Sequence, residues 1–299
     1  MRIVDGVAIK MNTMKNINVL LLGVVIFFFA CGKDEASQHQ DETPVVDEQI
    51  TENVIIEESS DFAFAPPSPL EIAAFFKQAG LVYDQTILNP VSNKDLYQTK
   101  LKKSLNFGVY AADLATCVVN DQISDAKGYL EATEYLANEI GMSNIFEETA
   151  MTKFKENISN TDSIIMILTE IQMNTIEYIE LNGKDDLEVV YFAGAWIEGM
   201  YLGSLTIMEQ DSGNVVQQLA SQIEFGNRIA TGLEVIEDQD PEIIYIRNGI
   251  LEIVNAYQNC ESIKNLTDED VDLGRLQMTK AELKEISELI VALRNDMIE

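Results

Sequence analysis

The stretch FAGAWIEGMYLG, residues 192–203, and a second stretch of the same character, NFGVYAADLA at residues 106–115, decide the fold of this chain. Each places small residues four positions apart in an otherwise apolar run, and that spacing lines one face of a helix. A glycine inside a helix costs about 1 kcal/mol relative to alanine, so several on one face indicate close approach of another helix. The two stretches are therefore predicted to be helices that pack together. Their small residues are Gly108 and Ala112 in one, and Ala195, Gly199 and Gly203 in the other.

Helical patterning continues on both sides of these stretches, with turn signals at even spacing and almost no alternating β-branched residues. The expected helices cover residues 70–80, 94–119, 124–140, 144–157, 161–181, 185–208, 214–237, 241–259 and 280–297. Short links make consecutive helices antiparallel. The predicted fold is all-α, a single antiparallel multi-helix bundle of about nine helices. A short helical-repeat superhelix resembling tetratricopeptide arrays is the alternative, although no period of about 34 residues recurs.

Each of the two central stretches carries one acid among apolar neighbours, Asp113 and Glu198. A carboxylate in such a setting is expected to be at least partly buried and to need a cation nearby. Arg228 and Arg247 lie in equally apolar helices and are the expected partners. The candidate site is completed by Asn106, Tyr110, Trp196 and Tyr201.

This group of residues has two interpretations. One is a buried ion-pair and tyrosine network that fixes the register of the helices. The other is a polar pocket, and in that case Asp113 and Glu198 make a carboxylate-dependent, glycosidase-like hydrolase the alternative function, provided that water reaches a shared cleft.

A short cationic and apolar segment precedes a cysteine near the start of the chain. Lys15 is followed by an unbroken apolar run over residues 19–29 and then by Ala30 and Cys31. The run is about half as long as the roughly twenty residues that span a bilayer. This pattern resembles the lipobox of bacterial lipoprotein signal peptides, which implies that Cys31 is acylated and anchors the mature chain to a membrane.

The same segment sets the expected domain boundaries. Residues 1–30 are predicted to be a signal peptide, with residues 1–13 lying before the true start. Residues 31–60 are acidic, with few apolar side chains, and are expected to form the lipidated cysteine and a disordered tether. Residues 61–299 are predicted to be one all-helical globular domain.

The formal net charge of −30 argues against a nucleic-acid partner, because the chain would repel phosphates. The acids that follow Cys31, in Lys33-Asp34-Glu35, resemble the export signal of surface lipoproteins in Bacteroidetes. The expected location is the cell envelope, with a lipid anchor in the outer membrane that leaves the domain on the periplasmic face or the cell surface.

The pattern Asn-x-Gly-x-Tyr-x-x-Asp-Leu from Asn106, followed by Gly-x-Trp-x-Glu-Gly-x-Tyr from Gly194, resembles uncharacterised helical envelope lipoproteins of Bacteroidetes. The resemblance covers most of the folded part and implies no activity. The expected function is a membrane-anchored, non-catalytic binding, scaffolding or accessory module. Its partners would be the membrane, through Cys31, and an envelope protein.

Several chemistries are disfavoured by the residues themselves. The one histidine, His39, lies in the tether, so histidine-based nucleophile systems and metal sites are not expected in the domain. The acids from Asp268 to Asp272 begin like a calcium loop, but Leu273 stands where that loop needs glycine. No metal and no cofactor is predicted. Cys117 and Cys260 remain as either a disulfide pair or two buried thiols.

Overall fold

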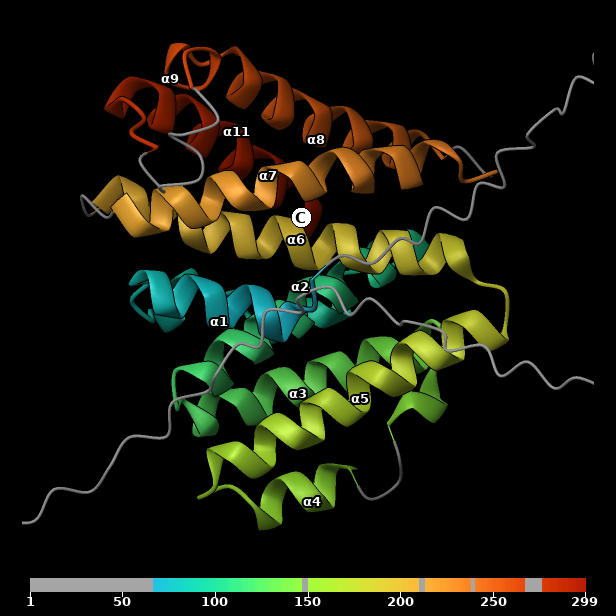
Figure 1. The fold of residues 1–299 in the computed structure, drawn as a ribbon. Helices are drawn as coiled ribbons and strands as arrows, with labels where there is room; N and C mark the ends of the chain where they lie inside the picture. The colour runs from blue at the N-terminus through green and yellow to red at the C-terminus, as the bar shows by residue number, and fades with distance from the viewer. Residues whose placement is uncertain (1–66, 147–149, 210–212, 238–239, 267–275) are drawn as a thin grey trace, which may run out of the picture. The chain divides into compact units, whose positions relative to one another are not determined.

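The computed structural model describes residues 67–146, 150–209, 213–237, 240–266 and 276–299, which fold into helices and contain no strand (Figure 1). The all-α prediction is confirmed. The α-helices are α1 (Pro69–Ala79), α2 (Lys100–Val119), α3 (Ile123–Glu139), α4 (Ala150–Glu156), α5 (Thr161–Leu181), α6 (Asp185–Glu209), α7 (Gly213–Glu234), α8 (Pro241–Asn259), α9 (Glu261–Lys264) and α11 (Lys280–Ile298). Three 3₁₀ turns accompany them, namely η1 (Gln85–Ile87), η2 (Val91–Asp95) and η3 (Ser143–Ile145).

Local capping residues set several helix ends where the sequence predicts them. Ser68 and Glu71 form a reciprocal capping box in front of α1, and Thr279 and Glu282 do the same for α11. Gly141 follows α3 with φ of 82°, a left-handed conformation that glycine adopts at low cost.

Two predicted boundaries are wrong. Helix α2 begins at Lys100 rather than at residue 94, because the Thr99 hydroxyl accepts a hydrogen bond from the backbone N–H of Lys102 and caps the helix there. The residues before it form η2 instead. The single helix expected over 144–157 is a 3₁₀ turn, η3, followed by the short α4 after residues that lie outside the described ranges.

Helices α2 and α6 make the most extensive contact in the described part of the chain. On one side, α3 packs on α2, and α5 contacts α2 and α6 and carries α4. On the other side, α7 and α11 pack on α6, and α8 packs on α7 and α11 (Figure 1). Consecutive helices α7 and α8 are antiparallel, since Gly226 meets Val254 while Arg247, earlier on α8, approaches Glu234, later on α7.

Helices α2 and α6 are far apart in sequence and run in the same direction. Leu105 lies against Gly194, and further along both helices Thr116 and Leu202 line one small cavity. The predicted packing of the two glycine-containing stretches is confirmed for Gly108, whose Cα faces the backbone of Tyr191 and Ala195. Gly199 and Gly203 instead receive Ile72 and Phe76 of α1.

Because the backbones of α2 and α6 lie so close together, adding a single methyl group between them should reduce the stability of the fold. A Cβ atom at Gly108 would overlap the carbonyl oxygen of Tyr191, and one at Gly194 would overlap that of Leu105. Because backbone atoms cannot rotate away, Gly108→Ala and Gly194→Ala should each lower the free energy of unfolding by about 1–3 kcal/mol, measured in urea.

Gly128 in α3 provides the matched control for these two variants. The nearest atom to a Cβ there is a Val91 methyl carbon at 3.6 Å, an ordinary contact. Gly128→Ala should therefore be neutral or should stabilise the fold by about 0.5–1 kcal/mol. Equal losses in all three variants would mean that helix packing between α2 and α6 is not the cause.

Candidate functional site

A buried ion pair joins the middle of α6 to the last helix. Arg294 of α11 donates from Nε to Oε2 of Glu198 at 2.8 Å and from Nη2 to Oε1 at 3.0 Å. Glu198 is 0% exposed and Arg294 is 4% exposed. Two parallel N–H···O bonds between planar groups give a strong and directional contact, so the pair fixes the position of α11 on α6.

The rest of the Arg294 side chain is also occupied. Its Nη2 donates a further bond to the carbonyl oxygen of Ile87 at 3.3 Å, and its guanidinium carbon lies 4.2 Å from the centroid of the Tyr201 ring. Burial opposes the charge of Arg294, but the carboxylate of Glu198 outweighs it and raises the pKa of the guanidinium. Arg294 is therefore permanently charged.

Asp113 of α2 lies beside this pair and is completely buried. Its Oδ2 accepts a hydrogen bond from the backbone N–H of Asn89 at 3.1 Å, while Oδ1 has no partner within hydrogen-bond geometry. Burial raises the pKa of Asp113 well above its usual range, the charge of Glu198 raises it further, and Arg294 lowers it only in part.

One cation thus faces two carboxyl groups, and the raised pKa of Asp113 resolves the imbalance. With a proton on Asp113, the pair of Glu198 and Arg294 is electrically neutral. A protonated carboxyl is also a hydrogen-bond donor, and Asp113 stands close enough to Glu198 for the charge of Glu198 to raise its pKa.

Amide and phenol side chains complete the network by holding the loop between α1 and α2. Asn89 Nδ2 donates to Tyr97 Oη at 2.9 Å, and Asn93 Nδ2 donates to Asn89 Oδ1 at 3.0 Å. Tyr110 Oη donates to the Pro90 carbonyl oxygen at 2.8 Å. Asn106 Nδ2 donates to the Met297 carbonyl oxygen at 3.0 Å, which links α2 to the end of α11. Together these bonds hold the loop against α2 and tie α2 to α11.

The structure brings together five of the eight residues that the sequence suggested for this site, namely Asn106, Tyr110, Asp113, Glu198 and Tyr201. Trp196 lies on another face of α6, where its indole N–H donates to the Gln222 carbonyl oxygen of α7 at 3.0 Å.

The predicted cations are wrong. Arg228 is exposed on α7, with its guanidinium carbon 5.5 Å from the Phe225 ring centroid, and Arg247 lies 3.9 Å from Glu234. Gly226 of α7 faces the Trp196 ring. Two residues further on, at about 100° per residue, the Arg228 side chain points away from α6.

The sequence contains a signal for the true cation. The buried face of α11 is made by Leu283, Ile286, Ser287, Ile290, Leu293, Arg294 and Met297, which recur at a spacing of three and four residues. Arg294 is the one charged residue on that apolar stripe, and a charge in that position needs a buried partner.

Cys117 and Cys260 are free buried thiols, which settles the choice between a disulfide and two thiols. Cys260 Sγ lies 3.3 Å from the Ala256 carbonyl oxygen, and Cys117 Sγ lies 3.6 Å from Tyr83 Oη. Cys31 and His39, together with the acidic loop from Asp268 to Leu273, lie outside the described residues.

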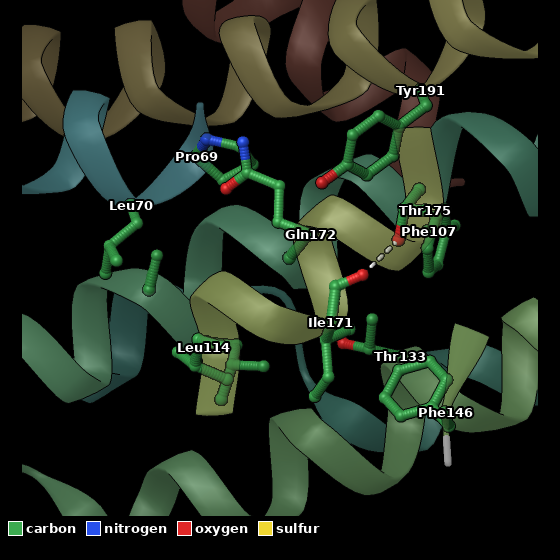
Figure 2. A pocket seen from close by; sticks show the side chains of 13 residues that line it. Pro69, Leu70, Phe107, Leu114, Thr133, Phe146, Ile171, Gln172, Thr175 and Tyr191 are labelled. Carbon is green, nitrogen blue, oxygen red and sulfur yellow. Dashed lines mark hydrogen bonds between the residues drawn. The ribbon is translucent and has the colours of Figure 1, made fainter. Parts of the chain in front are cut away.

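The cavity between α2, α3, α5 and α6 is too small for a ligand. Its volume is about 40 Å³, and Phe107, Thr133, Ile171 and Tyr191 are among the side chains around it (Figure 2). Thr175, also on the lining, donates from Oγ1 to the Ile171 carbonyl oxygen at 2.8 Å, as the dashed line shows. A space of this size holds one or two water molecules.

Comparison with protein-family models, curated proteins and solved structures found no match to this chain. Within the described ranges, no helix combines the length and apolar character that crossing a bilayer requires. Function is therefore inferred from the residues and their geometry.

Proposed function

We propose that the helical domain is a non-catalytic binding, scaffolding or accessory module that a lipid on Cys31 anchors in the cell envelope. The observation that carries the non-catalytic part is the closure of the network around Asp113 and Glu198. Both acids are 0% exposed, and Glu198 gives both of its oxygens to Arg294.

A carboxylate-dependent hydrolase needs a different arrangement. Its two carboxyl groups stand on either side of a substrate and at least one must reach water. Here the same groups are enclosed by α2, α6, α11 and the loop that contains Asn89. This enclosure favours the module over the hydrolase.

The anchoring part of the proposal is carried by the sequence before the domain. The apolar run over residues 19–29 ends at Ala30-Cys31. Several acyl chains on one cysteine, at about 0.8 kcal/mol per buried CH₂, hold a protein on a membrane without a spanning helix. The outer membrane of a Bacteroidetes-like envelope is the proposed location, with an envelope protein as the proposed partner.

Labelling with an alkyne fatty acid tests the anchor in a bacterium that processes lipoproteins. Wild type should be labelled and recovered with membranes. Cys31→Ser should not be labelled, and its membrane-bound fraction should be at least about tenfold smaller. Cys260→Ser is the matched control, because Cys260 is a buried thiol of the domain, and it should keep both. Equal labelling of Cys31→Ser and wild type would refute the anchor.

A further inference from the structure

A further cavity, larger than the one between α2, α3, α5 and α6, opens between helix ends and shares no lining residue with the Glu198 network. It lies where the N-terminal turns of α2, α6 and α8 meet the residues that follow α7, and its volume is about 300 Å³. That is about twice the size of a cavity that accepts benzene and falls at the lower end of small-molecule sites. It fits a molecule of about ten non-hydrogen atoms.

The floor of this cavity is apolar. It is formed by Leu101, Leu187, Val190, Ile236 and Ile243, and all of these except the half-buried Leu101 are buried. Binding of an apolar ligand to this floor is favourable, by about 25 cal/mol for each Å² of apolar surface that it removes from water.

The rim of the cavity is polar and predominantly acidic. Asp186 and Asp240 line it, together with Thr99 and Lys100. Asp185 and Glu237 stand close enough to Asp186 that, after burial, their charges raise its pKa. The repulsion among these acids would be relieved by a cation on the ligand.

Side-chain caps already occupy part of the donors that the N-termini of α2 and α8 would offer an anion, and Lys100 is the one cation among the lining residues against two acids. The Thr99 hydroxyl already accepts from Lys102 N at 3.0 Å, and Asp240 Oδ1 already accepts from Glu242 N at 2.8 Å. The nearby Lys102 lies 4.0 Å from the Glu242 carboxylate, which partly offsets its charge.

We propose that this cavity binds a small organic cation with an apolar body, of the size of an arylalkyl ammonium ion. The apolar part covers the floor between α2, α6 and α8, and the ammonium group lies at the rim beside Asp186 and Asp240. This inference rests on the proposed function, because it names the ligand class of the binding module.

Isothermal titration calorimetry of the full chain with phenethylammonium tests the proposal. Neutral 2-phenylethanol and anionic 3-phenylpropanoate are probes of nearly the same size that differ in charge. The cation should bind with one site per chain and with the highest affinity of the three. Tighter binding of the anion, or no saturable binding of the cation, would overturn the proposal.

Single substitutions at the cavity test whether the ligand binds there. Asp186→Asn should weaken phenethylammonium binding about threefold to fivefold, the range of a partly exposed ion pair. Asp162→Asn is the matched control, because Asp162 is an exposed acid at the same second position of a helix, in α5. It should bind like wild type, and equal affinities for both variants would refute the site.

Leu101→Trp provides a test that does not depend on charge. Leu101 is half-buried at the cavity, so a larger side chain there should fill the space and abolish saturable binding while leaving the helical circular dichroism unchanged. Undiminished binding would place the ligand elsewhere. Failure of these experiments leaves fatty-acid labelling of Cys31 unaffected, so it is distinguishable from failure of the anchored-module proposal.

Discussion

Arg294→Met should lower the free energy of unfolding by about 3–5 kcal/mol, the cost of leaving a buried charge without its partner. Methionine keeps the length of the side chain but removes the donors that hold both oxygens of Glu198. It also removes the bond to the Ile87 carbonyl oxygen, and so it loosens the loop before α2. Urea denaturation followed by circular dichroism measures the loss.

Arg228→Met is the matched control for this variant. Arg228 is exposed and lies over the Phe225 ring, away from the carboxyl groups, so its replacement should change stability by no more than about 0.5 kcal/mol. If the two variants were equally stable, Arg294 would not be the partner on which the buried acids depend.

The sequence predicted the helices well because their signals are local. Ser68 with Glu71, and Thr279 with Glu282, lie three residues apart and form capping boxes whatever the rest of the chain does. The start of α2 was missed although its cap, Thr99, is local as well. The asparagines before it bond to each other and to more distant groups, since Asn93 bonds to Asn89 and Asn89 bonds to Asp113 and Tyr97.

The acids of the network were predictable from their own helices, but their cation was not found in the same way. Asp113 and Glu198 stand among apolar residues four positions away on either side, which indicates burial in any fold. Which arginine reaches them depends on how helices separated by about a hundred residues are rotated about their axes. Arg228 and Arg247 share the apolar surroundings but point elsewhere, whereas Arg294 lies on the buried stripe of α11.

The raised pKa of Asp113 makes the stability of the domain depend on pH in a definite direction. The pKa of Asp113 in the folded domain is well above its ordinary value of 3.8. Above that ordinary value the unfolded chain loses the proton while the folded domain keeps it. Folding must then take up a proton, so this group makes the domain less stable as pH rises, by up to about 1.4 kcal/mol per pH unit until the folded pKa is passed.

Asp113→Asn replaces the titrating carboxyl group by an amide, which does not titrate. The variant keeps the shape of the side chain and has an N–H₂ group as donor. The stability of the variant relative to wild type should therefore improve as pH rises from 4. The improvement should be at most about 1.4 kcal/mol for each pH unit. Other titrating groups are common to both proteins and cancel in the difference.

The most direct measurement is the free energy of unfolding of wild type and Asp113→Asn, taken from urea curves at each half unit of pH between 4 and 8. If the network is closed and Asp113 retains its proton, wild type should have its largest advantage in free energy of unfolding at low pH. That advantage should shrink steadily, in favour of the Asp113→Asn variant, as pH rises. A difference that stays constant, or that moves toward wild type as pH rises, would mean that Asp113 is ionised in the folded domain. The two acids would then be a charged site within reach of water, and the structural account of them would be wrong.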